Sequence, residues 1–218
     1  MKYRIAVFDL DGTILDTAEG LLAAVKYTIE EMGLTMLSDE QLHTFIGPPI
    51  QDSFAKAYHL KGDILQTIAT CFRNRYKDYD LLKAVPYEGI YDVFENLHQK
   101  EIEVAVATYK RQDYAELILR HFGFDKYTRT MYGADHENKL KKVDIIEKCL
   151  KECKIYNGSN AVMIGDSSYD AIGAQKVGID FIGVTYGFGF QSVDSVLQAG
   201  AVGSADTPRD LIYFFDQA

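Results

Sequence analysis

The sequence predicts an α/β protein with a parallel β-sheet core and an inserted helical domain, and three observations support this. Residues 5–8 form an unbroken apolar run too short for a helix, which is typical of a strand buried on both faces. From residue 86 onward, short apolar runs alternate with helix-period patterns, as in a Rossmann-like sheet covered by helices. Residues 17–83 show helical patterns throughout, so we expect a small helical bundle there. The expected domains are residues 1–16 with 84–218, and residues 17–83.

Four helices are expected in the inserted domain. Apolar residues recur at helical spacing within residues 21–32 and again within residues 64–76. Ser38-Asp39-Glu40-Gln41 has the form of a capping box and marks the start of another helix between them. Gly47-Pro48-Pro49 ends that helix, and a proline there suits the first turn of the next one.

In the core, short apolar runs predict strands and longer periodic patterns predict helices. After the first strand, further strands are expected at residues 104–107, 127–132, 161–164 and 181–184. Helices are expected at residues 90–97, 114–118, 143–153 and 170–177. In parallel sheets of this kind, ligands bind at the carboxyl ends of the strands.

The composition excludes several classes of function. The 218 residues carry a net charge of −9, which argues against nucleic acid or an anionic membrane as the main partner. A local group of cations can still bind a small anion. No apolar stretch approaches the roughly 18 residues of a membrane span. Three cysteines without C-x-x-C spacing indicate a reducing compartment. We therefore expect a cytoplasmic protein, and the sequence leaves the choice between monomer and homodimer open.

Two carboxylates, Asp9 and Asp11, follow the first strand. If strand geometry persists through Asp11, its period of two puts both side chains on the same side. Two like charges that close cannot both ionise cheaply unless a cation lies between them. A hard divalent cation with oxygen ligands, such as Mg²⁺, meets that need, and Gly12 supplies a sharp turn. Taken alone, the stretch also fits a plain strand followed by an Asp-Gly turn.

The later strands also end in polar residues of useful type. Thr108-Tyr109-Lys110 follows one strand and Gly165-Asp166-Ser167-Ser168-Tyr169-Asp170 follows another. Lys139, Lys141 and Lys142 lie between these two motifs, just ahead of a helix. Any one of these groups could be a set of exposed polar residues without a function, but together they fall at one edge of one predicted sheet. The sequence therefore predicts a functional site at that edge.

These motifs, with the string from Phe8 to Thr17, resemble the haloacid dehalogenase (HAD) superfamily of phosphohydrolases over essentially the whole chain. The resemblance implies a HAD-type core with a helical cap at residues 17–83. It makes Asp9 the nucleophile that forms an aspartyl-phosphate, and Asp11 the general acid and then the base. Thr108 would hydrogen-bond the phosphoryl oxygens, and a lysine would neutralise their charge.

The same resemblance implies a Mg²⁺ site formed by Asp9, the backbone carbonyl of Asp11, and Asp166. Asp170 would either ligate the metal or hold the lysine in place. The lysine is Lys141 or Lys142, and we favour Lys142 because Lys-x-Asp-x-Ile entering a helix matches one branch of the family. The expected substrate-binding residues are Thr13, Thr108, Tyr109, Lys110, Gly47 and Pro48.

Several of these positions, and one further motif, carry alternative interpretations. The family commonly has a small residue where this chain has Tyr109, which leaves the roles of Tyr109 and Lys110 open. Gly47-Pro48-Pro49 would help to choose the substrate, or it is a plain helix breaker. Gly187-Phe188-Gly189 follows a strand but lacks the third glycine and the downstream acid of a dinucleotide site. The five histidines, His136 among them, show no metal-ligand spacing.

The function expected from the resemblance is Mg²⁺-dependent hydrolysis of a small phosphomonoester, either phosphoglycolate-like or a sugar phosphate. A sugar phosphomutase of the β-phosphoglucomutase type is the nearest alternative, and Thr13 favours hydrolysis because mutases usually have valine there. Nucleotide and pyrophosphate hydrolysis remain open. A non-catalytic protein that binds a phosphorylated metabolite is the alternative from a different functional class.

Overall fold

The computed structural model describes residues 2–135 and 139–216, so His136 lies outside the described residues. The chain forms two compact units, residues 1–16 with 86–218 and residues 17–85. Each unit is described separately below. Two-residue strands, β2 (Leu15–Asp16) and β3 (Val85–Pro86), pair with each other at the two points where the chain passes between the units.

The larger unit is built on a six-stranded sheet in the order β5-β4-β1-β6-β7-β8, in which every pair of neighbours is parallel. The predicted α/β fold with a parallel sheet is therefore confirmed. The strands are β1 (Ile5–Phe8), β4 (Glu103–Arg111), β5 (Thr130–Ala134), β6 (Ala161–Gly165), β7 (Asp180–Val184) and β8 (Gly203–Ala205).

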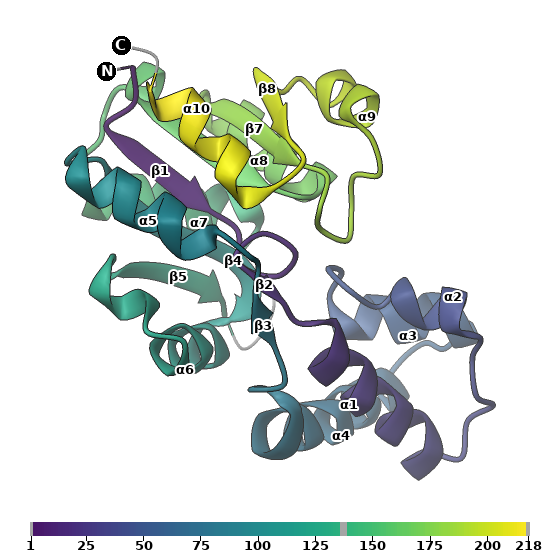
Figure 1. Ribbon diagram of the computed structural model, residues 1–218. Coiled ribbons are helices and arrows are strands. Elements are labelled where there is room, and N and C mark those ends of the chain that lie inside the picture. The colour runs from purple at the N-terminus through teal and green to yellow at the C-terminus, as the bar shows by residue number, and fades with distance from the viewer. Residues whose placement is uncertain (1, 136–138, 217–218) are drawn as a thin grey trace. The chain divides into compact units, whose positions relative to one another are not determined.

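Helices cover both faces of this sheet (Figure 1). They are α5 (Ile90–Gln99), α6 (Gln112–His121), α7 (Lys142–Glu152), α8 (Ser168–Val177), α9 (Val193–Gln198) and α10 (Leu211–Asp216). The Phe8 ring of β1 packs against Phe94 of α5, with ring centroids 4.9 Å apart. On the other face, Val7 joins a buried cluster with Ile146 of α7 and Met163 of β6. All four residues of β1 are fully buried, as its unbroken apolar run predicted.

The smaller unit contains the four expected helices, α1 (Ala18–Glu31), α2 (Asp39–His43), α3 (Ile50–Tyr58) and α4 (Ile64–Arg75). Ser38 and Gln41 form the predicted capping box at the start of α2. A π-helical turn, Tyr76–Asp80, continues α4 and was not predicted. Its last residue, Asp80, is fully buried and binds Arg75 Nε and Lys83 Nζ, each at 2.7 Å.

Some elements of the core differ from the sequence-based expectation. β8 (Gly-Ser-Ala) has no apolar run that could mark it as a strand, and it was not predicted. β5 begins at Thr130 and not at Tyr127, because the 3₁₀ turn at residues 124–126 is extended by hydrogen bonds from the Tyr127 and Thr128 N–H groups to the Phe124 carbonyl. The three cysteines are all free. Within the part of the chain that the structure describes, no helix combines the length and apolar character needed to span a membrane.

Candidate active site

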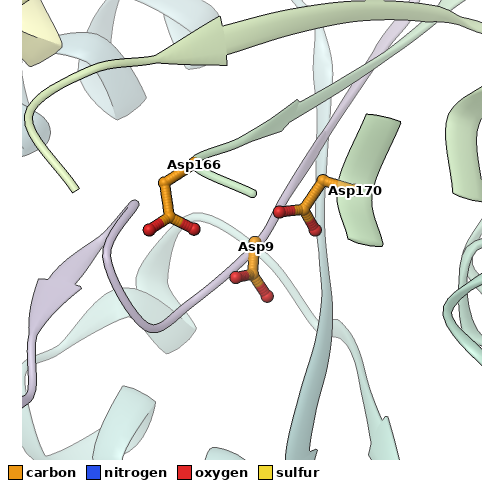
Figure 2. A group of neighbouring side chains, drawn as sticks. All are labelled: Asp9, Asp166 and Asp170. Carbon is orange, nitrogen blue, oxygen red and sulfur yellow. The ribbon is translucent and has the colours of Figure 1, made fainter. Parts of the chain in front are cut away.

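Three carboxylates meet at the carboxyl edge of the sheet (Figure 2). Asp9 directly follows β1, Asp166 directly follows β6, and Asp170 lies in the first turn of α8. The parallel register places Phe8 opposite Ile164, and the Asp9 N–H donates to the Ile164 carbonyl at 2.8 Å. One carboxylate oxygen from each of the three aspartates lies within 4.8 Å of the others, and all three residues are buried.

Lys142 is the positive charge among these acids. It is the first residue of α7, and its Nζ lies 2.6 Å from Asp9 Oδ1 and 2.7 Å from Asp170 Oδ1. Its side chain is only 4% exposed. Lys141, the other lysine that the sequence left open, is exposed, and its N–H donates to Asp144 Oδ2 at the start of α7. Of these two lysines, the structure brings Lys142 to the carboxylates.

Burial and like charges set the protonation of this group. Burial raises the pKa of Asp9 to about 8, and the nearby Asp170 and Asp166 charges also raise it while Lys142 opposes them. Burial and Asp170 raise the pKa of Asp166 to about 7, against hydrogen bonds from the Phe188 and Gly189 N–H groups. Burial alone would lower the pKa of Lys142, but Asp170 and Asp9 outweigh it and raise that pKa.

The donor set fits a divalent cation. A bound divalent cation would favour the ionised form of all three carboxylates, against the raised pKa values of Asp9 and Asp166. When ionised, the three carboxylates and the Lys142 ammonium carry a net charge of −2, which one divalent ion would balance. The available ligands are oxygens, which hard cations such as Mg²⁺ prefer. Asp170 is already engaged, because Oδ1 contacts Lys142 and Oδ2 accepts from the Ser167 N–H at 3.1 Å and hydroxyl at 2.6 Å. Asp9 and Asp166 are therefore the better placed carboxylate ligands.

Strand geometry does not persist as far as Asp11. β1 ends at Phe8, and the chain turns back so that the N–H groups of Thr13, Ile14 and Leu15 all donate to the Leu10 carbonyl. The condition on which the period-of-two argument for Asp11 depended is therefore not met. The Asp11 carboxylate instead pairs with Lys110, whose Nζ lies 2.8 Å from Asp11 Oδ1, and both side chains are largely buried.

The motif Thr108-Tyr109-Lys110 also lies at this edge of the sheet. Thr108 is 1% exposed, and its Oγ1 accepts from the Lys110 N–H at 3.0 Å. The Tyr109 hydroxyl accepts from the Lys142 N–H at 2.9 Å, and the Lys142 Nζ lies 5.7 Å from the centre of the Tyr109 ring. Tyr169 packs edge-on against that ring. Tyr109, which departs from the family pattern, thus contacts both ends of Lys142.

The other residues expected to bind substrate have different surroundings. Thr13 is fully buried, and among the described residues its Oγ1 has no hydrogen-bond partner. Its carbonyl accepts from the Tyr186 hydroxyl at 3.0 Å. Gly47 and Pro48 belong to the smaller unit, in the loop between α2 and α3, and their contact with a substrate stays a prediction.

The segment that follows β7 had no functional role in the sequence analysis. In the structure, the N–H groups of Phe188 and Gly189 donate to Asp166 Oδ2 at 2.7 and 3.0 Å. The only sequence signal was Gly187-Phe188-Gly189 itself, which was interpreted as a failed dinucleotide motif. Backbone donors leave no signature in residue types, so this contact could not be predicted.

Comparisons with known proteins agree with this geometry. Residues 6–184 match the family model of the haloacid dehalogenase-like hydrolases. The chain is 30% identical over 189 residues to a 5'-nucleotidase of Pseudomonas aeruginosa, covering 87% of this chain and 86% of that protein. It is 25% identical over 193 residues to a phosphoglycolate phosphatase of Vibrio parahaemolyticus, covering 85% of each.

The fold is similar to solved structures as well. A crystal structure described as a predicted phosphatase from Clostridium acetobutylicum has a TM-score of 0.91 and 30% identity, with full coverage of both chains. The family match spans well over half of the chain and includes Asp9, Asp166 and Lys142. The chain therefore belongs to the haloacid dehalogenase-like hydrolase family, and its relatives place it among the phosphatases of that family.

Proposed function

We propose that this protein hydrolyses a small phosphomonoester through an aspartyl-phosphate formed on Asp9, with Mg²⁺ as its cofactor. The observation that carries the proposal is the position of Asp9, which directly follows a central strand, contacts Lys142 and lies close to two further carboxylates. A carboxylate held by one ammonium beside a cation site suits in-line attack on phosphorus. Phosphoryl transfer depends mainly on such positioning and on charge neutralisation.

In the first step, Asp9 attacks the phosphorus atom and the bond to the ester oxygen breaks. This step requires Asp11 to exchange its contact with Lys110 Nζ for a proton, which Asp11 then gives to that oxygen as the alcohol leaves. In the second step, Asp11 takes a proton from water, the water oxygen attacks phosphorus, and the bond to Asp9 breaks to release phosphate. Lys142 and Thr108 hold the phosphoryl oxygens through both steps. Asp9, Asp166 and the Asp11 carbonyl would hold Mg²⁺, which would supply further neutralisation of the phosphoryl charge.

Asp170 is proposed to position Lys142 rather than to bind the metal. The contact of its Oδ1 with Lys142 Nζ and the two hydrogen bonds of its Oδ2 with Ser167 support this choice. With Asp9 on its other side, the ammonium is bound by two carboxylates. A lysine with so little freedom loses little conformational entropy when a phosphoryl group arrives.

The substrate is proposed to be a small phosphate ester, and the names of two relatives suggest two substrate classes. One relative is named a 5'-nucleotidase and another a phosphoglycolate phosphatase. Nucleoside monophosphates and phosphorylated acids are both phosphomonoesters, so the chemistry proposed for Asp9 and Asp11 serves either. A sugar phosphomutase remains the alternative, and Thr13 favours hydrolysis. A purified-enzyme screen of these esters, with release of inorganic phosphate as the readout, decides between them.

Asp9→Asn should leave the fold intact and remove turnover, because an amide cannot act as the attacking carboxylate. Phosphate release should fall by at least a thousandfold, measured with the best ester from the screen. Asp125→Asn, an exposed aspartate on the same unit, is the matched control and should behave as wild type. Turnover by Asp9→Asn within tenfold of wild type, with deamidation excluded by mass spectrometry, would contradict the proposed nucleophile.

The two neighbouring lysines offer a second matched pair. Lys142→Met should abolish turnover and lower the free energy of unfolding by roughly 3–5 kcal/mol, because it leaves buried carboxylates without their partner. Lys141→Met should change stability by less than about 0.5 kcal/mol, since its side chain is exposed. Urea denaturation and steady-state kinetics measure both effects. If the two variants behave alike, Lys142 does not have the proposed role.

Metal removal should abolish activity, and Mg²⁺ should restore it. Binding of Mg²⁺ to the carboxylates should also raise the thermal denaturation midpoint of the metal-free protein, because a ligand that binds the folded state stabilises it. Ca²⁺ should restore activity poorly, since it accepts looser geometry and more ligands. Full activity after exhaustive chelation would refute the metal requirement.

The helical unit is proposed to supply substrate selectivity. The chain enters this unit after Asp16 and leaves it at Pro86, and Asp16 directly follows the turn that comes after Asp9. Replacing Gly47 and Pro48 together by alanine should change relative kcat/KM among natural esters by tenfold or more, about 1.4 kcal/mol. Hydrolysis of p-nitrophenyl phosphate should change much less.

The control for this loop is Gly62→Ala in the same unit. Like Gly47, Gly62 has a positive φ, and no atom lies within 4 Å of an added Cβ at either position. Gly62→Ala should therefore reproduce the strain of an alanine at a positive φ, which is the glycine part of the loop change, without altering selectivity. A loop variant that slows every ester by one common factor would show that Gly47-Pro48-Pro49 has only a structural role.

A further inference from the structure

We propose that the segment Tyr186–Phe190 is a backbone clamp that fixes Asp166 as a metal ligand and ties it to the turn after Asp9. We call residues 186–190 the clamp segment. It lies between β7 and α9 and contains no ionisable side chain other than tyrosine. The inference rests on the proposed metal site, and it concerns how this chain's own residues prepare that site.

The clamp segment holds Asp166 by both its side chain and its backbone. The N–H groups of Phe188 and Gly189 donate to Asp166 Oδ2 at 2.7 and 3.0 Å, and the Phe190 N–H donates to the Asp166 carbonyl at 2.7 Å. Asp166 itself is only 3% exposed. With two donors on Oδ2, the orientation of the carboxylate is fixed, and Oδ1 is the oxygen left to serve a cation.

The clamp segment also contacts the turn that follows Asp9. The Tyr186 hydroxyl donates to the Thr13 carbonyl at 3.0 Å. A Cβ added at Gly187 would lie 2.2 Å from the Gly12 carbonyl oxygen and 2.4 Å from Asp166 Cβ. A Cβ added at Gly12 would lie 2.3 Å from Asp166 Oδ2. Glycine is therefore required on both sides of Asp166.

Neutral backbone donors are well suited to this task. A lysine or arginine in their place would bind the Asp166 carboxylate as an ion pair and compete directly with a metal cation. N–H groups orient the carboxylate and leave its charge available to the metal, as the outer groups around metal ligands commonly do. The contacts with Gly12 and Thr13 also keep Asp166 in register with Asp9, so that both ligands meet the cation together.

The test is Mg²⁺ affinity, measured by isothermal titration calorimetry and by the Mg²⁺-dependent rise of the denaturation midpoint, with no activity readout. Gly187→Ala should weaken Mg²⁺ binding about 10- to 100-fold, which is typical for loss of groups that orient a metal ligand. Tyr186→Phe removes one hydroxyl and keeps the ring, and it should weaken binding at least about threefold by loosening the tie to Thr13.

Gly158→Ala is the matched control. Its added Cβ would lie 2.3 Å from the Gly178 carbonyl oxygen, a clash as close as that at Gly187, in the 3₁₀ turn that precedes β6 rather than at its carboxyl end. It should lower stability and leave Mg²⁺ affinity at the wild-type value.

Equal Mg²⁺ affinity in wild type, Gly187→Ala and Tyr186→Phe would overturn the clamp, and so would an equal loss in Gly187→Ala and Gly158→Ala. If Gly187→Ala does not fold, Tyr186→Phe alone decides, and wild-type affinity in that variant overturns the inference. If wild type itself binds no Mg²⁺, the proposed metal site fails first, and the clamp fails with it. These outcomes separate a failure of the inference from a failure of the proposed function.

Discussion

The arrangement of side chains at the carboxyl edge of the sheet depends on one electrostatic constraint, the burial of three carboxylates beside one ammonium. Asp9, Asp166 and Asp170 are withdrawn from water, and Lys142 offsets only one of their charges. Such a group is costly in the folded state unless a cation completes it. Packing elsewhere in the fold must offset this cost in free energy, and the fully buried β1 at the centre of the sheet contributes to that packing.

Much of this fold was readable from the sequence because its signals are local. The apolar run of β1, the capping box at Ser38 and the alternation after residue 86 each have a direct physical cause within a few residues. β8 and the π-helical turn had no such signal. β8 owes its position to pairing with β7, and the π-helical turn accompanies the ion pairs of the buried Asp80 with Arg75 and Lys83. Residue periodicity does not encode contacts of either kind.

The site was predictable to the extent that residue type carries the chemistry. Carboxylates after β1 and β6 had to meet because parallel strands end at one edge. The pairing of Asp11 with Lys110 was missed because it depends on where β1 stops. The support of Lys142 by Tyr109 was missed because one hydroxyl accepts from a backbone N–H far along the chain. The family match and the named relatives together indicate a phosphatase, but relatives with similar cores carry names for different substrates.

The pairing of β2 with β3 has a consequence for how proteins of this kind can diversify. The two ends of residues 17–85 leave the core from adjacent, hydrogen-bonded strands. An insert whose ends lie together can be exchanged for another of different length without stretching the host chain, which is the geometry that tolerates domain insertion. The junction at Asp16 and Pro86 is thus a site at which one inserted domain can be replaced by another. Chimaeras joined there would carry one reaction centre into a series of unrelated helical modules.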